Sequence, residues 1–177
     1  TGRARFRADV GLRNGRIAAI SRGQLLQGSE TIDATGHIVS PGFIDAHSHS
    51  DWILPSPEHP AILQPFLLQG VTTVVTGNCG GSELKLSEWF AQLEKMKLGL
   101  NLASLIGHNT VRREVMGTEN RAAKPEEIAR MQALVEQAMR EGAVGLSTGL
   151  IYIPGTYSTP DEVVALGKAA AKHYGVY

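Results

Sequence analysis

The chain has 177 residues, of which 42% are hydrophobic and 19% charged, with a formal net charge of zero. These values describe a globular protein with a sizeable core and exclude a disordered chain. The neutral charge gives no electrostatic case for a nucleic-acid partner or an anionic membrane surface, and no apolar run reaches the roughly 20 residues that span a bilayer.

Cys79 is the single cysteine of the sequence, which excludes an internal disulfide framework. One cysteine and the lack of a signal-like start fit a reducing compartment, so the cytoplasm is the expected location. The chain begins at Thr1 without a methionine and ends in "KHYGVY", where an apolar strand would begin. We therefore expect a piece of a longer protein, and its oligomeric state stays open.

Residues 1–40 are expected to form part of a small β domain. Asn14-Gly15 separates two apolar stretches, and this pair readily adopts the positive φ angles of a tight hairpin turn. A second strand–turn–strand unit is predicted over residues 30–42, around Thr35-Gly36. No helical periodicity interrupts this region.

From residue 41 onward, strands and helices are predicted to alternate. The expected strands are 42–47, 71–81, 100–109 and 143–149, and the expected helices are 60–70, 85–99, 124–142 and 158–175. Pro65 interrupts the first helix, Ser87 is the expected N-cap of the second, and a fifth strand starts near Val176. This alternation indicates βαβ units with a parallel sheet. Four units make either a small open sheet or half of an eight-unit barrel, which takes about 250 residues.

Polar side chains gather where these strands end, which is where parallel α/β folds place their functional groups. The first strand ends in His47 and His49, and the second ends at Cys79. The third ends at His108, and the fourth runs on to Tyr152. These five residues are the candidate site residues.

His47 and His49 are two residues apart, so on a strand both imidazoles point to one face. Two neutral imidazoles on one face form a chelating pair that suits zinc. The alternative is that they are ordinary polar residues of a loop. The preceding strand, and Asp51 shortly after, favour the metal interpretation.

Cys79 lies in "TGNCGG", where the glycines allow a tight turn and a close approach to a neighbour. As a thiolate it is a strong zinc ligand. It is otherwise a buried free cysteine, or a nucleophile with His108 or His47 as its base. The two histidines on the adjacent strand favour the ligand role.

His108 and Tyr152 are candidates for contact with a substrate. Each has an ordinary structural alternative: His108 satisfies loop backbone groups, and Tyr152 packs with its hydroxyl at the surface. The sequence contains no Walker A pattern, no dinucleotide fingerprint and no G-x-S-x-G elbow.

Several stretches resemble a known family. "SPGFIDAHSHSD" resembles the strand-one motif of the amidohydrolase superfamily, and "VTTVVTGNCGGS", "GHNTVRREVMG" and "GAVGLSTGLIYIPGTYS" resemble its D-aminoacylase branch, the N-acyl-D-amino-acid deacylases. The likeness runs from about Val10 to the end of the chain. It implies an α/β fold in which residues 41–177 form the first half of a TIM-like (β/α)8 barrel, preceded by a small β-sandwich segment over residues 1–40.

The resemblance also implies roles for single residues. His47, His49 and Cys79 would be ligands of one or two zinc ions, and Tyr152, with His108, would face the substrate. Related hydantoinases and dihydroorotases use a carboxylated lysine at the end of strand four, where this sequence reads "GLSTG". The other histidine ligands and the general-base aspartate are expected beyond residue 177, so no catalytic residue is assigned within this chain.

The activity implied is zinc-dependent hydrolysis of the amide bond of N-acyl-D-amino acids, giving a D-amino acid and a carboxylate. The alternatives are a cyclic-amide hydrolase of hydantoinase or dihydroorotase type, a non-catalytic relative without metal, and a metal-free cysteine hydrolase. The sequence does not decide the acyl chain, the amino-acid side chain, the stereochemical preference or the number of metal ions.

Overall fold

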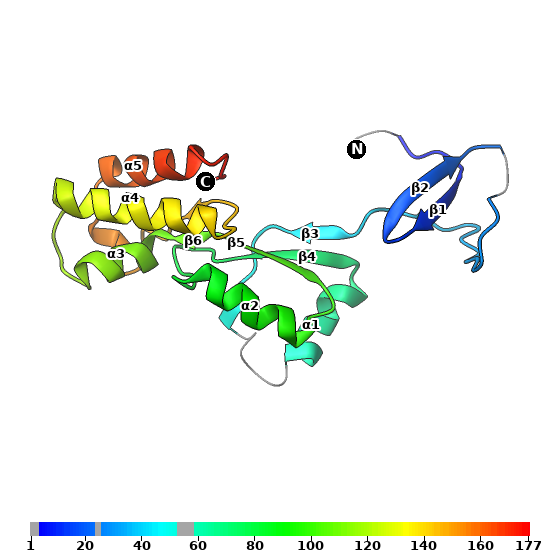
Figure 1. The fold of residues 1–177 in the computed structure, drawn as a ribbon, viewed down its shortest axis with the longest axis horizontal. Helices are drawn as coiled ribbons and strands as arrows, with labels where there is room; N and C mark the ends of the chain where they lie inside the picture. Colours follow the sequence, from blue (N-terminus) through cyan, green and yellow to red (C-terminus); the bar gives the residue numbers. More distant parts are fainter. Residues whose placement is uncertain (1–3, 24–25, 53–58) are drawn as a thin grey trace. The chain divides into compact units, whose positions relative to one another are not determined.

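The computed structural model describes residues 4–23, 26–52 and 59–177, and it divides into two compact units, Thr1–Pro41 and Gly42–Tyr177 (Figure 1). In the first unit, β1 (Asp9–Arg13) and β2 (Arg16–Ser21) form an antiparallel pair. Asn14 and Gly15 join them with φ angles of 51° and 70°. The predicted hairpin is therefore confirmed, whereas assigning this unit to a β sandwich stays a prediction.

The second strand–turn–strand unit predicted over residues 30–42 is wrong. A turn does form, because the His37 N–H donates to the Ala34 carbonyl at 2.9 Å, but no strand flanks it. Ile32, Ile38 and Val39 are exposed. Among the described residues no strand lies beside them, and alternating apolar side chains need a paired backbone to become a strand.

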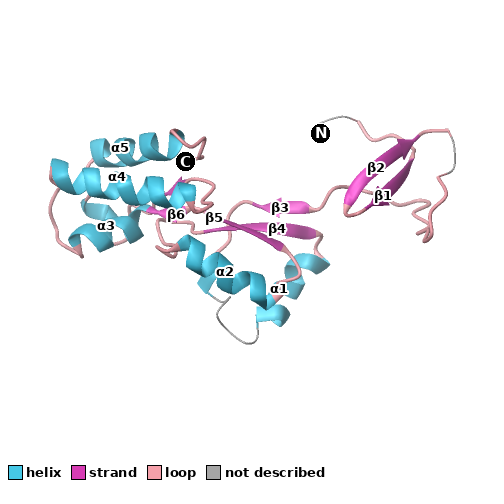
Figure 2. Cartoon of the chain, viewed as in Figure 1, coloured by secondary structure: helices cyan, strands magenta, loops and turns pink. Residues whose placement is uncertain are grey.

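The second unit alternates strands with helices, as Figure 2 shows. In chain order its strands and α-helices are β3 (Phe43–Asp45), α1 (His59–Leu68), β4 (Val71–Thr76), α2 (Leu86–Met96), β5 (Asn101–Ser104), β6 (Ile106–Gly107), α3 (His108–Met116), α4 (Pro125–Arg140), β7 (Leu146–Ser147) and α5 (Pro160–Ala171). Two short 3-10 helices, η1 (Ser50–Trp52) and η2 (Gly155–Tyr157), complete it. The α/β class is confirmed.

All strand pairs of this unit are parallel, as predicted. β4 lies between β3 and β5, and β6 pairs with β7. Residues 101–107 pass from one partner to the next: the Leu105 N–H donates to the Thr76 carbonyl at 3.0 Å, and the Ile106 N–H donates to the Gly145 carbonyl at 2.9 Å. Val176 forms a parallel bridge with Gly145, where the fifth strand was expected.

Two helix predictions need correction. Ser87 is not an N-cap, because α2 begins one residue earlier and the Ser87 N–H donates to Glu141 Oε2 at 3.1 Å. Helix α3 was not predicted, and His108 is its first residue instead of a strand end. The buried face of α3 includes His108, Asn109 and Arg112, so the polar side chains hide its helical period.

The core of this unit lies where the helices meet the strands. α3 packs on α4 and α4 on α5 beside β6 and β7, while α1 lies along β4 (Figure 1). None of the helices in the described part of the chain combines the length and apolar composition needed to cross a membrane. The fully buried apolar side chains include Leu63, Leu86, Ile106, Val111, Met131, Leu146 and Leu166.

Candidate metal centre

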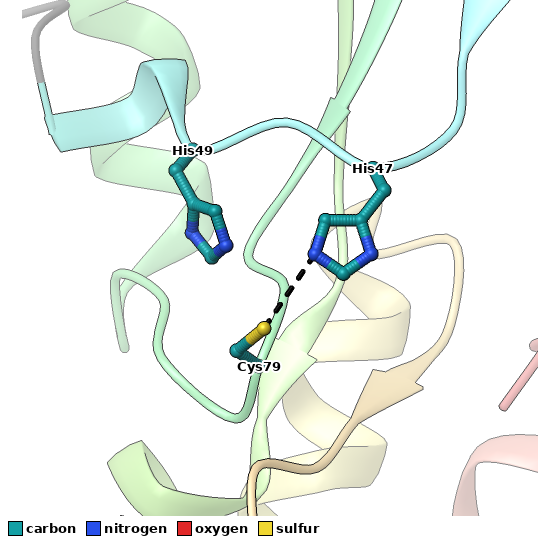
Figure 3. Close-up of side chains that lie close together, drawn as sticks. All are labelled: His47, His49 and Cys79. Atoms are coloured by element: carbon teal, nitrogen blue, oxygen red, sulfur yellow. Dashed lines mark hydrogen bonds between the residues drawn. The ribbon is translucent and has the colours of Figure 1, made fainter.

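His47, His49 and Cys79 come together at the carboxyl ends of β3 and β4. Their ligand atoms all lie within 4.8 Å of one another, and the two imidazoles and the thiol point into the same space (Figure 3). His47 Nε2 is 3.5 Å from Cys79 Sγ, and the two imidazole centroids are 5.4 Å apart. His47 is exposed and the other two are partly buried.

The distance between His47 Nε2 and Cys79 Sγ suits two ligands of one zinc ion. Tetrahedral zinc with sulfur at about 2.3 Å and nitrogen at about 2.0–2.1 Å separates the two ligand atoms by about 3.6 Å. The observed separation of Cys79 Sγ from His47 Nε2 is 3.5 Å. Thiolate and imidazole are the ligand types that zinc prefers. In the described residues no carboxylate belongs to this group, so positions remain for further ligands.

The two histidines do not lie on a strand, because β3 ends at Asp45. Asp45 Oδ1 accepts the His47 N–H at 3.1 Å and turns the chain. The Ser48 N–H then donates to the Val75 carbonyl of β4 at 2.9 Å. The expected strand geometry is therefore wrong in detail, while the segment still runs beside β4 and both imidazoles face Cys79.

The turn that carries Cys79 has left-handed backbone at three residues. The φ angles are 72° at Gly77, 55° at Cys79 and 78° at Gly80. Ser147 at the end of β7 spans this turn: its hydroxyl donates to the Gly77 carbonyl at 2.5 Å and accepts the Gly80 N–H at 3.0 Å. The first turn of α3 adds a bond from the Thr110 N–H to the Gly80 carbonyl at 3.2 Å.

Asp51 lies in η1, directly after the segment 47–49 that carries the two histidines (the histidine segment), and it is buried. Burial raises the pKa of its carboxyl above the ordinary value, against the opposing effect of hydrogen bonds from the backbone N–H groups of Asp51 and Gly77. Asp51 Oδ1 is buried without a hydrogen-bond partner in the described part of the chain.

Tyr152 lies in the loop after β7 and is 54% exposed. Helix α3 holds this loop through Asn109 Nδ2, which donates to the Gly149 carbonyl at 3.3 Å. A Cβ at Gly149 would lie 2.0 Å from the Cys79 carbonyl oxygen and 2.8 Å from the Tyr152 ring. The loop of Tyr152 therefore lies against the turn of Cys79, and its contact with a substrate stays a prediction.

His108 lies apart from His47, His49 and Cys79 and is fully buried. Its Nε2 is 2.8 Å from Glu162 Oε1 on α5, and Glu162 also pairs with Arg112. The imidazole thus exposes no surface to a substrate in this arrangement. Burial of Glu162 opposes its ionisation, but hydrogen bonds from His108 and Arg112 prevail and hold its pKa below the ordinary value.

Sequence reasoning gave no role to Asn78 or Ser147, although both stand at predicted strand ends. Asn78 directly precedes Cys79 and is 7% exposed. Its side chain bonds to the backbone of the histidine segment, as Ser147 does to the turn of Cys79. The position of each residue at a predicted strand end was the only signal in the sequence. That position does not indicate which group Asn78 or Ser147 binds.

Parallel α/β architecture with a His–His–Cys group at adjacent strand ends defines a candidate metal-binding α/β protein. A family model described as "Amidohydrolase family" matches residues 30–177. The chain belongs to the amidohydrolase family.

Three related proteins give this membership more detail. D-aminoacylase of Alcaligenes xylosoxydans xylosoxydans is 38% identical over 194 residues, covering 97% of this chain and 40% of that protein. N-acyl-D-aspartate deacylase of the same organism is 38% identical over 179 residues, covering 88% of this chain and 35% of that protein.

The third is a solved structure of N-acyl-D-glutamate deacylase from Bordetella bronchiseptica, complexed with zinc and a phosphonate inhibitor that mimics the tetrahedral intermediate. It matches with a TM-score of 0.86 at 34% identity and covers 99% of this chain and 41% of that one. This chain thus spans 35–41% of the length of the three relatives.

The buried group of Glu162, His108 and Arg112 predicts a large effect on stability. Glu162→Ala removes the carboxylate that His108 and Arg112 contact in the core. The free energy of unfolding should therefore fall by about 3–5 kcal/mol. Glu136→Ala is the matched control, because it removes an exposed contact with Lys172 and should change little. Urea denaturation measures both, and equal effects would contradict the structure.

The same group predicts a pH dependence. Because the pKa of Glu162 is lowered by folding, its contribution is complete above the unfolded-state value of about 4.3. It is lost as the pH falls through the lower folded-state pKa. Wild-type protein should therefore lose more stability than Glu162→Ala between pH 5 and pH 2, in denaturation curves that are measured at both ends of that range.

Trp52 predicts a spectroscopic signal of metal binding. Its ring centroid is 5.3 Å from that of His49 and its side chain is 76% exposed, whereas Trp89 is buried on α2. Co²⁺ bound at His49 should quench Trp52 fluorescence, because paramagnetic ions quench fluorophores at short range. In a Co²⁺ titration the quenching should vanish in Trp52→Phe and persist in Trp89→Phe; the reverse pattern would contradict this geometry.

Proposed function

We propose that the full-length protein is a zinc-dependent hydrolase that cleaves the amide bond of N-acyl-D-amino acids. The observation that carries the proposal is the convergence of His47, His49 and Cys79 within 4.8 Å at adjacent strand ends. The relatives support the substrate class, since they include D-aminoacylase and N-acyl-D-aspartate and N-acyl-D-glutamate deacylases. The products would be a D-amino acid and a carboxylate.

Each residue of the group has a definite task in this proposal. His47, His49 and Cys79 would hold one or two zinc ions, which when bound lower the pKa of a water molecule and polarise the acyl carbonyl. Tyr152 would donate its hydroxyl proton in a hydrogen bond to the substrate carboxylate. The general base in this proposal is an aspartate beyond residue 177, as the resemblance to the D-aminoacylase branch implies.

A cyclic-amide hydrolase is the second candidate, and the end of β7 weighs against it. That candidate would resemble enzymes with a carboxylated lysine there, whereas Ser147 occupies this position and bonds to Gly77 and Gly80. In this proposal Cys79 supplies the anionic ligand from the turn after β4 instead. The relatives at 38% identity include both D-aminoacylase and N-acyl-D-aspartate deacylase, so neutral and acidic D-amino acids are both candidate substrates.

We also propose the cytoplasm as the location. Reducing conditions keep a lone cysteine available as a thiolate ligand. The partner in this proposal is a small-molecule substrate, with neither nucleic acid nor a membrane involved.

Removing one ligand tests the proposal. Cys79→Ala and His47→Ala should each lower zinc content and should slow deacylation by more than the roughly 10–100-fold that loss of outer groups costs. His37→Ala is the matched control, because His37 is exposed and its ring contacts only the Thr35 carbonyl at 3.1 Å among described contacts. Metal analysis and initial rates on the full-length protein measure both effects.

Two further measurements separate the alternatives. Rates on N-acyl-D-amino acids, their L isomers and hydantoins distinguish a deacylase from a cyclic-amide hydrolase. Full activity after exhaustive chelation would point to a metal-free cysteine hydrolase. Zinc binding without turnover of any of these substrates would point to a non-catalytic relative.

A further inference from the structure

We infer that Asn78 is a positioning residue that joins the backbone of His47 and His49 to the turn of Cys79. This inference rests on the proposed metal centre and concerns how its two parts are held together. Asn78 immediately precedes Cys79, while the histidines follow a different strand. A side chain that bonds across this gap fixes the relative position of the ligands.

The contacts of Asn78 are specific for an amide. Its Nδ2 donates to the Ser48 carbonyl at 3.2 Å and to the Val75 carbonyl at 2.9 Å. Both partners are acceptors, so the side chain must present its NH₂ group to them, which uses both of its protons. An aspartate of the same shape would instead place one carboxylate oxygen, which carries no proton to donate, against both carbonyl oxygens.

Ser48 is the residue between the two histidines, and both of its peptide groups are bound. Its carbonyl accepts from Asn78, and its N–H donates to the Val75 carbonyl at 2.9 Å. The peptide planes next to His47 and His49 are therefore fixed from the neighbouring strand. The backbone that carries both imidazoles is thereby held in place relative to the Cys79 thiol.

The hydrogen bond between Asn78 and the Ser48 carbonyl is shielded from water. Asn78 is 7% exposed and Ser48 6% exposed, so water does not readily replace the amide. A Ser48 carbonyl left unpaired in this position would be a buried acceptor without a hydrogen bond, which is unfavourable. The segment would then shift toward solvent, and the histidines would move away from Cys79.

The test compares metal affinity in the full-length protein. Asn78→Ala removes both donors, and Asn78→Asp removes them while keeping the size of the side chain. Asn101→Ala is the matched control, since Asn101 Nδ2 donates to the Thr72 carbonyl at 3.0 Å at the opposite end of β4. It removes the same kind of bond from the same sheet without touching the metal-binding side chains.

Co²⁺ and Zn²⁺ are the probes, with the thiolate-to-cobalt charge-transfer band reporting Cys79. Both Asn78 variants should bind about 10–100-fold more weakly, as is typical when the support of metal ligands is lost. Asn101→Ala should bind as wild type does. Thermal unfolding and circular dichroism of the metal-free proteins separate this effect from a general loss of the fold.

The outcomes test the positioning role of Asn78 separately from the proposed metal centre. Wild-type affinity in both Asn78 variants would overturn the positioning role, and so would variants that no longer fold without metal, because Asn78 would then serve the fold itself. If the wild type binds no metal, or Cys79→Ala binds as tightly, the proposed metal centre fails whatever Asn78 does. Weak binding by the Asn78 variants together with a normal Asn101 variant supports the inference.

Discussion

The close approach of three backbone segments around Cys79 is the constraint on which the candidate site depends. A Cβ at Gly149 would lie 2.0 Å from the Cys79 carbonyl oxygen, and a Cβ at Gly107 would lie 2.3 Å from the Gly80 carbonyl oxygen. Neither position accepts a larger residue without displacing backbone. The end of β6 and the loop after β7 can therefore lie directly against this turn, which brings the thiol to the edge of the sheet where His47 and His49 lie.

The conformation of this turn is a property of the tertiary structure. A left-handed backbone at a residue other than glycine costs about 1–2 kcal/mol, and Cys79 has a φ angle of 55°. Hydrogen bonds from Ser147 and Thr110, each worth about 0.5–1.5 kcal/mol, offset that cost. Ser147 at the end of β7 and Thr110 on α3 thus hold the backbone of Cys79 in a conformation that the local sequence does not favour.

Several features of the fold follow from local signals in the sequence. The turn at Asn14-Gly15 and the alternation of strands with helices follow from residue types a few positions apart. His47, His49 and Cys79 could be grouped because parallel strands end at one edge. Local signals failed where partners decide the outcome: residues 30–42 lack a neighbouring strand, and Asn78 contacts Ser48 across thirty positions.

The beginning of α3 shows why such contacts resist prediction. Successive residues of a helix point about 100° apart, so three neighbours reach three different parts of the molecule. His108 meets Glu162 in the core, Asn109 binds the Gly149 carbonyl, and Thr110 bonds with Ser82 at 2.9 Å and 3.0 Å. One helical turn thus anchors α5, the loop of Tyr152 and the loop that follows Cys79. In the sequence, residues 108–110 resemble a polar strand end. Their partners are distant along the chain, so no local pattern indicates a helix. The buried ion pair of Glu162 with Arg112 lies on the α5 side of this helix, whereas neutral hydrogen bonds from Asn109 and Thr110 hold the loops that contain Gly149 and Ser82.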